Sequence, residues 1–496
     1  MRFVLDTNII IPLEDSSKIL EAPLSHFIKS ATLSGHTLMY HPATIRDIQR
    51  DSNLIRKEIS LSRLNKYIQL EGHSCNKSDI DHLFGYSNTE NDACDNEILH
   101  ALYCNCADFL ISEDIGIHRK AKRSGISDRV LYIQQARNLF GIDAKSDTII
   151  FPGISNKFLS EIDSNNHFFD SLRSSYSGFN SWFEKCQRSG RKAWIISAES
   201  DIGAIIIYKD EESPIVTDDS KGLKGKSLKL CTFKVGELCQ GRKFGELLLK
   251  KAFNYAFEGN YDWVYLTIRE NSQLHLIDLL GNFGFEIFGK CLQLNGEYDL
   301  VLAKPMKPVT AEFYDTLDFT IKYYPWFTIK QSTKAYIVPI KPRYHLQLFP
   351  EIQVQSSLFE NSITAGNAIN QAYLSNSKIK SINSGDVLLF YRSGDVKGIT
   401  SIGIVEKCER TKDSKIVVQL TRKRTIYSEN DINKICEKDT LVLLFKVICH
   451  FESAISSKSL SNIGVIGAIQ TIRKIDRIHL EHILKEYRVK NHFHSN

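Results

Sequence analysis

Two acidic residues, Asp95 and Asp114, flank a segment whose pattern would bring them to one site. Apolar residues recur at three- and four-residue steps from Asp95 to Cys106, which predicts an amphipathic helix. The apolar run at 109–111 then predicts a buried strand of a parallel sheet. Asp95 would lie near the start of the helix and Asp114 just beyond the strand. That end of the strands is where open α/β sheets place their sites.

Carboxylates held close together repel each other, and a hard divalent cation with oxygen ligands would offset the repulsion. The alternative is two solvated acids, one in a first helical turn and one in a loop. The amino terminus favours the first interpretation, because residues 2–5 and 37–40 predict two more strands that are each followed by an acid. The four acids expected to converge are Asp6, Asp47, Asp95 and Asp114.

This pattern resembles the PIN-domain nucleases over residues 1–148. The resemblance rests on a strand followed by Asp-Thr-Asn, an acid after the second strand, Asp-x-x-Ile-Leu, and Ala-Asp-Phe-Leu-Ile-Ser-Glu-Asp. It implies a three-layer α/β/α domain in which the four acids bind Mg²⁺ or Mn²⁺. The metal would activate a water molecule that cleaves RNA. Asp47 stands where the family more often has Glu.

Several polar residues near these acids have two interpretations each. Ser112 matches the small hydroxyl residue of the family and would orient a ligand. Asn8 would either do the same or cap the following helix, and Asp92 is either a spare metal ligand or a helix cap. The basic run that contains Arg119 and Lys120 is either a solvated helix face or a contact for the phosphates of a nucleic acid.

The length of 496 residues suggests three domains, at about 150 residues each. An apolar fraction of 42% is ordinary for a globular protein, and a net charge of +5 permits nucleic-acid binding without requiring it. The 11 cysteines are scattered and predict no zinc site. Without a signal peptide or a long apolar run, we expect a cytoplasmic protein that does not bind membranes.

A second motif lies between a predicted strand, 228–235, and a helix that begins near Leu247. A glycine-containing turn at the start of a helix presents backbone N–H groups to an anion such as a pyrophosphate. The strand and helix order resembles the GNAT acetyltransferase fold over 155–306, which implies an α/β domain that binds acetyl-CoA. The implied cofactor contacts are Val235, Gln240, Gly241, Arg242, Lys243 and Gly245.

The match to the GNAT pattern is incomplete. Lys243 replaces the central glycine of the turn, so its side chain would either crowd the phosphate or pair with it. Leu280 stands where many members have a tyrosine that acts as general acid. Glu237 is a candidate base acting through water, or simply a solvent-facing strand residue.

A linker at 307–329 leads to a β-rich region at 330–496, with predicted strands that include 387–391, 415–420 and 440–447. Gly-Asp before an apolar strand and a closing Gly-x-x-Gln-Thr-Ile-Arg resemble the PUA-like group, nearest its EVE and ASCH types. The resemblance implies a small β-barrel that binds RNA or a modified base. The implied contacts are Tyr391, Arg392, Gln470, Thr471 and Arg473, with Arg422, Lys423 and Arg424 as phosphate contacts.

Taken together, the sequence predicts a multidomain α/β and α+β protein that cleaves RNA with a metal ion. Its GNAT-like domain would use acetyl-CoA for regulation or catalysis, and its barrel would bind tRNA or another modified nucleic acid. This domain combination suggests a bacterial toxin or phage-defence effector held by an inhibitory partner protein. The alternative is an N-acetyltransferase acting on RNA or protein with a PIN-like domain that does not cleave. A third interpretation is a binding module for modified nucleic acid.

Overall fold

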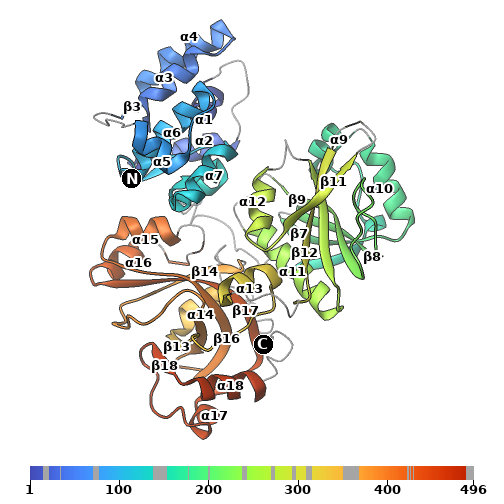
Figure 1. Ribbon diagram of the computed structural model, residues 1–496, viewed down its shortest axis with the longest axis vertical. Helices are drawn as coiled ribbons and strands as arrows, with labels where there is room; N and C mark the ends of the chain where they lie inside the picture. The colour runs from blue at the N-terminus through green and yellow to red at the C-terminus, as the bar shows by residue number, and fades with distance from the viewer. Residues whose placement is uncertain are drawn as a thin grey trace. The chain divides into compact units, whose positions relative to one another are not determined.

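A computed structural model describes residues 1–486 apart from 15–21, 34, 71–76, 138–152, 177, 199–200, 237–238, 240–242, 270–273, 293–295, 297, 309–314, 350–367, 422–423, 425 and 428. The chain divides into two compact units (Figure 1). Unit 1 comprises Met1–Ser146, Asp413–Lys423 and Tyr427–Cys436, and unit 2 comprises the remainder. Within the described ranges, no helix is long and apolar enough to cross a membrane.

Unit 1 is built on a parallel sheet of five strands in the order β3-β2-β1-β4-β5. The strands are β1 (Arg2–Leu5), β2 (Thr37–Tyr40), β3 (Ile68–Gln69), β4 (Phe109–Ile111) and β5 (Val130–Leu131). The helices are α1 (Thr7–Glu14), α2 (Ala22–Leu33), α3 (Pro42–Gln49), α4 (Leu54–Arg63), α5 (Lys77–Phe84), α6 (Glu90–Tyr103), α7 (Ile115–Arg123) and α8 (Ile133–Arg137).

Successive residues of the central strands enter two separate cores. Phe3 and Leu5 pack on one face of the sheet with residues of α1 and α2, whereas Val4 and Leu110 pack on the other with residues of α5, α6 and α7. This alternation follows from the two-residue period of a strand. Unit 1 is therefore a three-layer α/β/α structure, as expected.

Two helices from the far end of the sequence complete unit 1: α15 (Ser414–Thr421) and α16 (Glu429–Cys436). The prediction of a strand at 415–420 is wrong. Val417 and Thr421, four residues apart, are both fully buried on one face of α15. Gln419 donates from Nε2 to the backbone oxygen of Asp108 at 3.1 Å. The residues of 415–420 favour a strand by local propensity, but packing of one buried face stabilises the helix instead.

Unit 2 contains a sheet of seven strands in the order β11-β12-β10-β9-β8-β7-β6. They are β6 (Ile154–Phe158), β7 (Lys192–Ala198), β8 (Asp201–Glu212), β9 (Lys226–Val235), β10 (Trp263–Arg269), β11 (Glu286–Leu292) and β12 (Tyr298–Pro305). Helices α9 (Asp170–Ser175) and α10 (Phe179–Arg188) cover one face, and α11 (Phe244–Glu258) and α12 (Leu274–Gly281) cover the other (Figure 1).

A second sheet of unit 2 has six strands in the order β14-β17-β16-β15-β13-β18. They are β13 (Ala335–Ile340), β14 (Asn370–Ser375), β15 (Val387–Arg392), β16 (Gly398–Thr411), β17 (Thr440–Ser456) and β18 (Arg473–Ile475). The accompanying helices are α13 (Thr316–Tyr323), α14 (Pro342–Leu348), α17 (Ser457–Asn462) and α18 (Arg477–Glu486).

The expected closed barrel is not found. β14 and β18 form the two edges of the six-stranded sheet in the described residues, so the sheet is open. Helix α13 lies within the stretch that we expected to be a linker. The two sheets of unit 2 share one hydrophobic core, in which Phe244 and Leu248 of α11 belong to the same cluster as Ile337 and Leu389.

Candidate functional site

The neighbouring strands β9 and β10 separate part of the way along their length. They pair in parallel only from Ser227 to Lys229 of β9, opposite Trp263 to Tyr265 of β10. Beyond this point β9 remains paired with β8, and β10 with β12. Residues 230–235 and 266–269 therefore form a fork between the two strands, called here the β9–β10 fork. Among the described residues, β9 has no strand pairing on its β10 side beyond Lys229.

A β-bulge accounts for the fork. Tyr208 of β8 lies opposite Leu230, whereas the preceding Ile207 lies opposite Thr232, so Cys231 is the extra residue of β9. A bulge bends its own strand and increases the local twist. The bulge comes two residues after the last pair between β9 and β10, so it bends β9 away from β10.

Helix α11 begins just beyond the fork with an unusual residue. Lys243, its N-cap, has a left-handed backbone with φ of 61°. Its ammonium forms an ion pair with Glu246 in the first turn of the helix. A Cβ added to Gly245 would meet side-chain atoms of Phe233, Val235 and Leu279 at 3.5 to 3.8 Å, which are ordinary contact distances. The start of α11 therefore lies against the end of β9 and against α12.

The predicted cofactor contacts are only partly described. Val235 ends β9, and Lys243 and Gly245 start α11, so these three lie at the mouth of the fork. Gln240, Gly241, Arg242 and the candidate base Glu237 lie outside the described residues. Leu280 is fully buried in the core beside α11. Sequence reasoning missed Glu246, although an acid three residues after a helix cap is a recognisable signal.

The four acids of unit 1 lie at the carboxyl ends of the parallel strands or on the adjoining helices. Ser112 links two of them: its hydroxyl donates to Oδ2 of Asp6 at 2.6 Å and accepts from the backbone N–H of Asp114 at 3.0 Å. Asn8 donates from Nδ2 to the same hydroxyl at 3.2 Å and accepts from the backbone N–H of Glu113. Ser112 thus holds Asp6 and the start of α7 together, and Asn8 joins the ends of β1 and β4 instead of capping a helix.

The carboxyl groups of these acids perturb one another. Burial raises the pKa of Asp6 to about 6, against hydrogen bonds from Ser112 and Thr7, and Asp114 and Asp47 raise it further. Burial likewise raises the pKa of Asp95 to about 7, with the carboxylates of Asp6 and Asp114 adding to the effect. Acids that repel each other across a site are the arrangement that a divalent cation would stabilise.

Two of the four carboxylates, those of Asp47 and Asp114, already bind protein groups through one oxygen. Oδ1 of Asp47 pairs with Arg50 at 2.6 Å, and Oδ1 of Asp114 accepts from the backbone N–H of Ile117 at 3.0 Å. In the part of the chain that the structure describes, no group of three or more His, Cys, Asp or Glu is placed to hold a metal ion. Binding a metal would therefore require Asp47 and Asp114 to exchange these partners.

Two residues of the basic run beside the acids, Arg119 and Lys120, differ in their surroundings. Lys120 is buried and donates to Asn96 Oδ1 at 2.6 Å and to Asp92, so the phosphate role predicted for it does not fit its position. Asp92 pairs with Lys120, and its Oδ2 accepts from the backbone N–H of Asn88 at 3.1 Å, just before Thr89, the N-cap of α6. Arg119 is exposed on α7.

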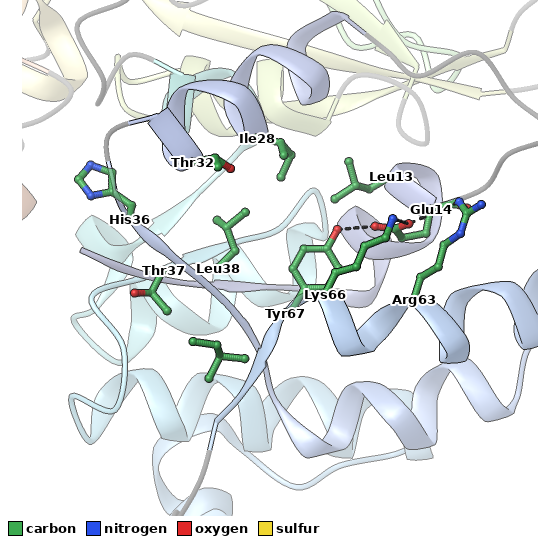
Figure 2. Close-up of a pocket in the computed structure, with 11 residues that line it drawn as sticks. Leu13, Glu14, Ile28, Thr32, His36, Thr37, Leu38, Arg63, Lys66 and Tyr67 are labelled. Carbon is green, nitrogen blue, oxygen red and sulfur yellow. Dashed lines mark hydrogen bonds and ion pairs between the residues drawn. The ribbon is translucent and has the colours of Figure 1, made fainter.

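A cavity of about 580 Å³ lies elsewhere on unit 1, among α1, α2, β2 and the segment that leads to β3 (Figure 2). At one end, the Glu14 carboxylate accepts from Tyr67 Oη at 2.6 Å and Lys66 Nζ at 2.8 Å, with Arg63 alongside. His36 and Thr32 lie toward the other end. None of the four acids lines this cavity.

Two of the residues expected to read nucleic acid on the six-stranded sheet, Arg392 and Arg473, have partners within the protein. Tyr391 is buried in the core, and Arg392 pairs with Asp395. Arg473 is the first residue of β18, the edge strand next to β13. Its guanidinium donates to the backbone oxygen of Ile466 at 2.6 Å. Gln470 and Thr471 are exposed.

The basic cluster expected to hold phosphates is only partly described. Arg424 forms a two-point ion pair with Glu406 at 2.7 and 2.9 Å. Its neighbours Arg422 and Lys423 lie outside the described residues. The one described member of the cluster therefore already has a carboxylate partner.

Comparison with known proteins identifies one part of the chain. Residues 158–285 match the acetyltransferase (GNAT) family. No curated protein matches the chain. Among solved structures, Ard1 from Thermoplasma volcanium is 13% identical, with 32% of this chain and 100% of that chain covered and a TM-score of 0.25. A NatC complex bound to Gag peptide and CoA is 15% identical, with 31% and 99% covered and a TM-score of 0.23.

The ASCH protein from Zymomonas mobilis is a further structural neighbour. It is 10% identical, with 31% of this chain and 94% of that chain covered and a TM-score of 0.24. The family match includes the bulged β9, the fork and the start of α11. Residues 158–285 thus form an acetyltransferase domain of the GNAT family.

Proposed function

We propose that this protein is an N-acetyltransferase that uses acetyl-CoA and acts on an amine of RNA or protein. The observation that carries the proposal is the fork between β9 and β10 beside the start of α11, within the segment that matches the GNAT family. Acetyl-CoA would supply the acetyl group as a thioester, which an amine can attack.

The described residues suit both ends of such a cofactor. The open edge of β9 offers backbone N–H and C=O groups to an extended chain of amides, as an added strand would. The first turn of α11 offers free N–H groups and the positive end of the helix dipole to a diphosphate. Lys243, the N-cap of α11, adds the positive charge of its ammonium at the same end of the helix.

Transfer requires the acceptor amine to attack the thioester carbon, forming a C–N bond while the C–S bond breaks. The amine must give up a proton in this step. With Leu280 buried and apolar, no tyrosine at that position supplies the leaving thiolate with a proton. A group elsewhere, of which Glu237 is our candidate, would receive the proton of the amine through water.

Transfer of a labelled acetyl group tests the proposal. The purified protein would be incubated with acetyl-CoA labelled in the acetyl group, together with total RNA or with a protein extract. Label appearing in one of the two acceptors, and absent with heat-denatured enzyme, would support transfer and assign the class of acceptor. Label in neither, despite bound acetyl-CoA, would favour a sensing role for the domain.

A second candidate function is metal-dependent RNA cleavage by unit 1. It is favoured by two observations: Ser112 joins Asp6 and Asp114 at one end of a parallel sheet, and the carboxylates of both raise the pKa of Asp95. Asp6, Asp95 and Asp114, with Asp47 after it leaves Arg50, would hold Mg²⁺ or Mn²⁺. The proposed partner is RNA, and a role as a toxin or phage-defence effector with an inhibitory partner stays a prediction.

Cleavage of total RNA in Mg²⁺ or Mn²⁺ tests this second function. Wild type would be compared with Asp6→Asn and Asp95→Asn, and with Glu97→Gln as a control. Glu97 lies on the same helix as Asp95 but pairs with Arg46 at 2.5 Å. Cutting that is lost only in the two Asp variants would support the nuclease. Cutting that survives in both would exclude this set of acids.

A further inference from the structure

Glu246, in the first turn of α11, joins two parts of unit 2 through its two carboxylate oxygens. Oε1 pairs with the ammonium of Lys243, at the start of the same helix. Oε2 accepts from the backbone N–H of Ile369 at 3.2 Å. Ile369 immediately precedes β14 of the six-stranded sheet. The Glu246 side chain is only 6% exposed, whereas that of Lys243 is 21% exposed. A buried carboxylate bound on both oxygens fixes its partners relative to each other.

The same strand start is tied to the second helix beside the fork. Lys446 of β17 donates to Asn370 Oδ1 at 2.7 Å and to the backbone oxygen of Asn282, just past α12, at 3.3 Å. Ile369 itself is fully buried in the core shared by the two sheets. The first residues of β14 are therefore bound to the start of α11 and to the end of α12.

The ammonium of Lys243 could pair with either of two anions. One is Glu246, and the other is the diphosphate that the N-terminus of α11 would receive in the proposed acetyl-CoA site. A diphosphate carries more charge than a carboxylate and would lie at the residue that caps the helix. When Lys243 turns to the diphosphate, Glu246 loses a cation and becomes a stronger acceptor for the N–H of Ile369.

We propose that Glu246 is a positioning residue that couples acetyl-CoA binding to the six-stranded sheet. In the free protein it holds Lys243. In the CoA complex Lys243 leaves it for the diphosphate, and Glu246 tightens its bond to Ile369 at the start of β14. This inference rests on the proposed acetyl-CoA site. Because coupling between two sites is reciprocal, a ligand that orders β14 would in turn strengthen CoA binding.

Calorimetric titration of the full chain with CoA and with pantetheine, which lacks the diphosphate, tests the exchange. Glu246→Gln still accepts the N–H of Ile369 but cannot hold Lys243 as an ion. It should bind CoA about five- to tenfold more tightly than wild type, with pantetheine binding unchanged. In a Lys243→Met background the same substitution should have no effect on CoA. Glu258→Gln, at the exposed far end of α11, is the control.

Amide hydrogen exchange provides a readout that a purely structural role would not change. Exchange at residues 369–375 should slow when CoA binds wild type and should not respond in Glu246→Gln. If CoA binds but Glu246→Gln leaves its affinity unchanged, or changes pantetheine binding equally, the coupling is refuted while the cofactor site stands. If neither wild type nor variant binds CoA, both the coupling and the proposed cofactor site are refuted.

Discussion

Ser112 and Asp6 are joined by a hydrogen bond of 2.6 Å between side chains 106 residues apart in sequence. Each follows a neighbouring strand of the parallel sheet, Asp6 after β1 and Ser112 after β4. The bond is buried, and the hydroxyl also accepts from the N–H of Asp114. The sheet thereby fixes one carboxylate and the start of the helix that Asp114 caps.

Replacing Ser112 with alanine should lower the stability of unit 1 by about 1–3 kcal/mol, because a buried carboxylate loses a donor. It should also raise the pKa of Asp6, because this hydrogen bond is the largest influence that lowers it. Urea unfolding followed by circular dichroism measures the first effect. Ser62→Ala, on an exposed hydroxyl of α4, is the control. Equal stability of the two variants would contradict a structural role for the Ser112 bond.

The acids also predict how stability depends on pH. The pKa values of Asp6 and Asp95 in the folded state, about 6 and about 7, exceed the ordinary value of 3.8. The folded state therefore binds these protons more tightly than the unfolded state. Their contribution favours folding below the ordinary pKa and is lost as pH rises through 6 to 7. Thermal melts of wild type from pH 5 to pH 8 without metal should show falling stability of unit 1.

Replacing Asp95 with asparagine should remove most of this loss. The variant should be more stable than wild type at pH 8 by on the order of 1–3 kcal/mol, with a smaller difference at pH 5. Glu97→Gln on the same helix should show no such gain. A variant that is destabilised at pH 8 would show that Asp95 is held by favourable partners and not by repulsion.

Helices α15 and α16 give a prediction about how unit 1 is assembled. Val417→Ala should destabilise unit 1 by about 1–3 kcal/mol, because its side chain is fully buried. Ile416→Ala, on the adjacent residue that is 42% exposed, is the matched control and should cost much less. Limited proteolysis should cleave residues 1–137 faster in Val417→Ala than in wild type, and no faster in Ile416→Ala. That result would support α15 as part of the core of unit 1. Equal effects of the two variants would argue against α15 as part of the core.

The sequence predicted the elements whose local pattern and tertiary role agree. The strands after which Asp6 and Asp114 lie are short apolar runs buried on both faces, and their parallel pairing places Ser112 beside Asp6. The strand and helix on either side of Lys243 were found for the same reason.

What escaped prediction depends on partners distant in sequence. The stretch Lys-Ile-Val-Val-Gln-Leu has high β propensity, yet unit 1 buries one helical face of it. Lys120 was predicted to be solvated or to contact a phosphate, but it forms an ion pair with Asp92, 28 residues earlier. Similarly, no local signal links Glu246 to the backbone of Ile369, 123 residues away.

The start of α11 and the β9–β10 fork are proposed to bind acetyl-CoA, and titration of Gly245 variants with acetyl-CoA measures that binding. A Cβ at Gly245 would make contacts only at ordinary distances, so Gly245→Ala should fold, and circular dichroism checks the fold of Gly245→Asp. Asp places a negative charge at the expected diphosphate position, and should weaken binding at least tenfold, while Ala should bind within about threefold of wild type. Equal binding by wild type and Gly245→Asp, or no binding by wild type, would contradict the claim.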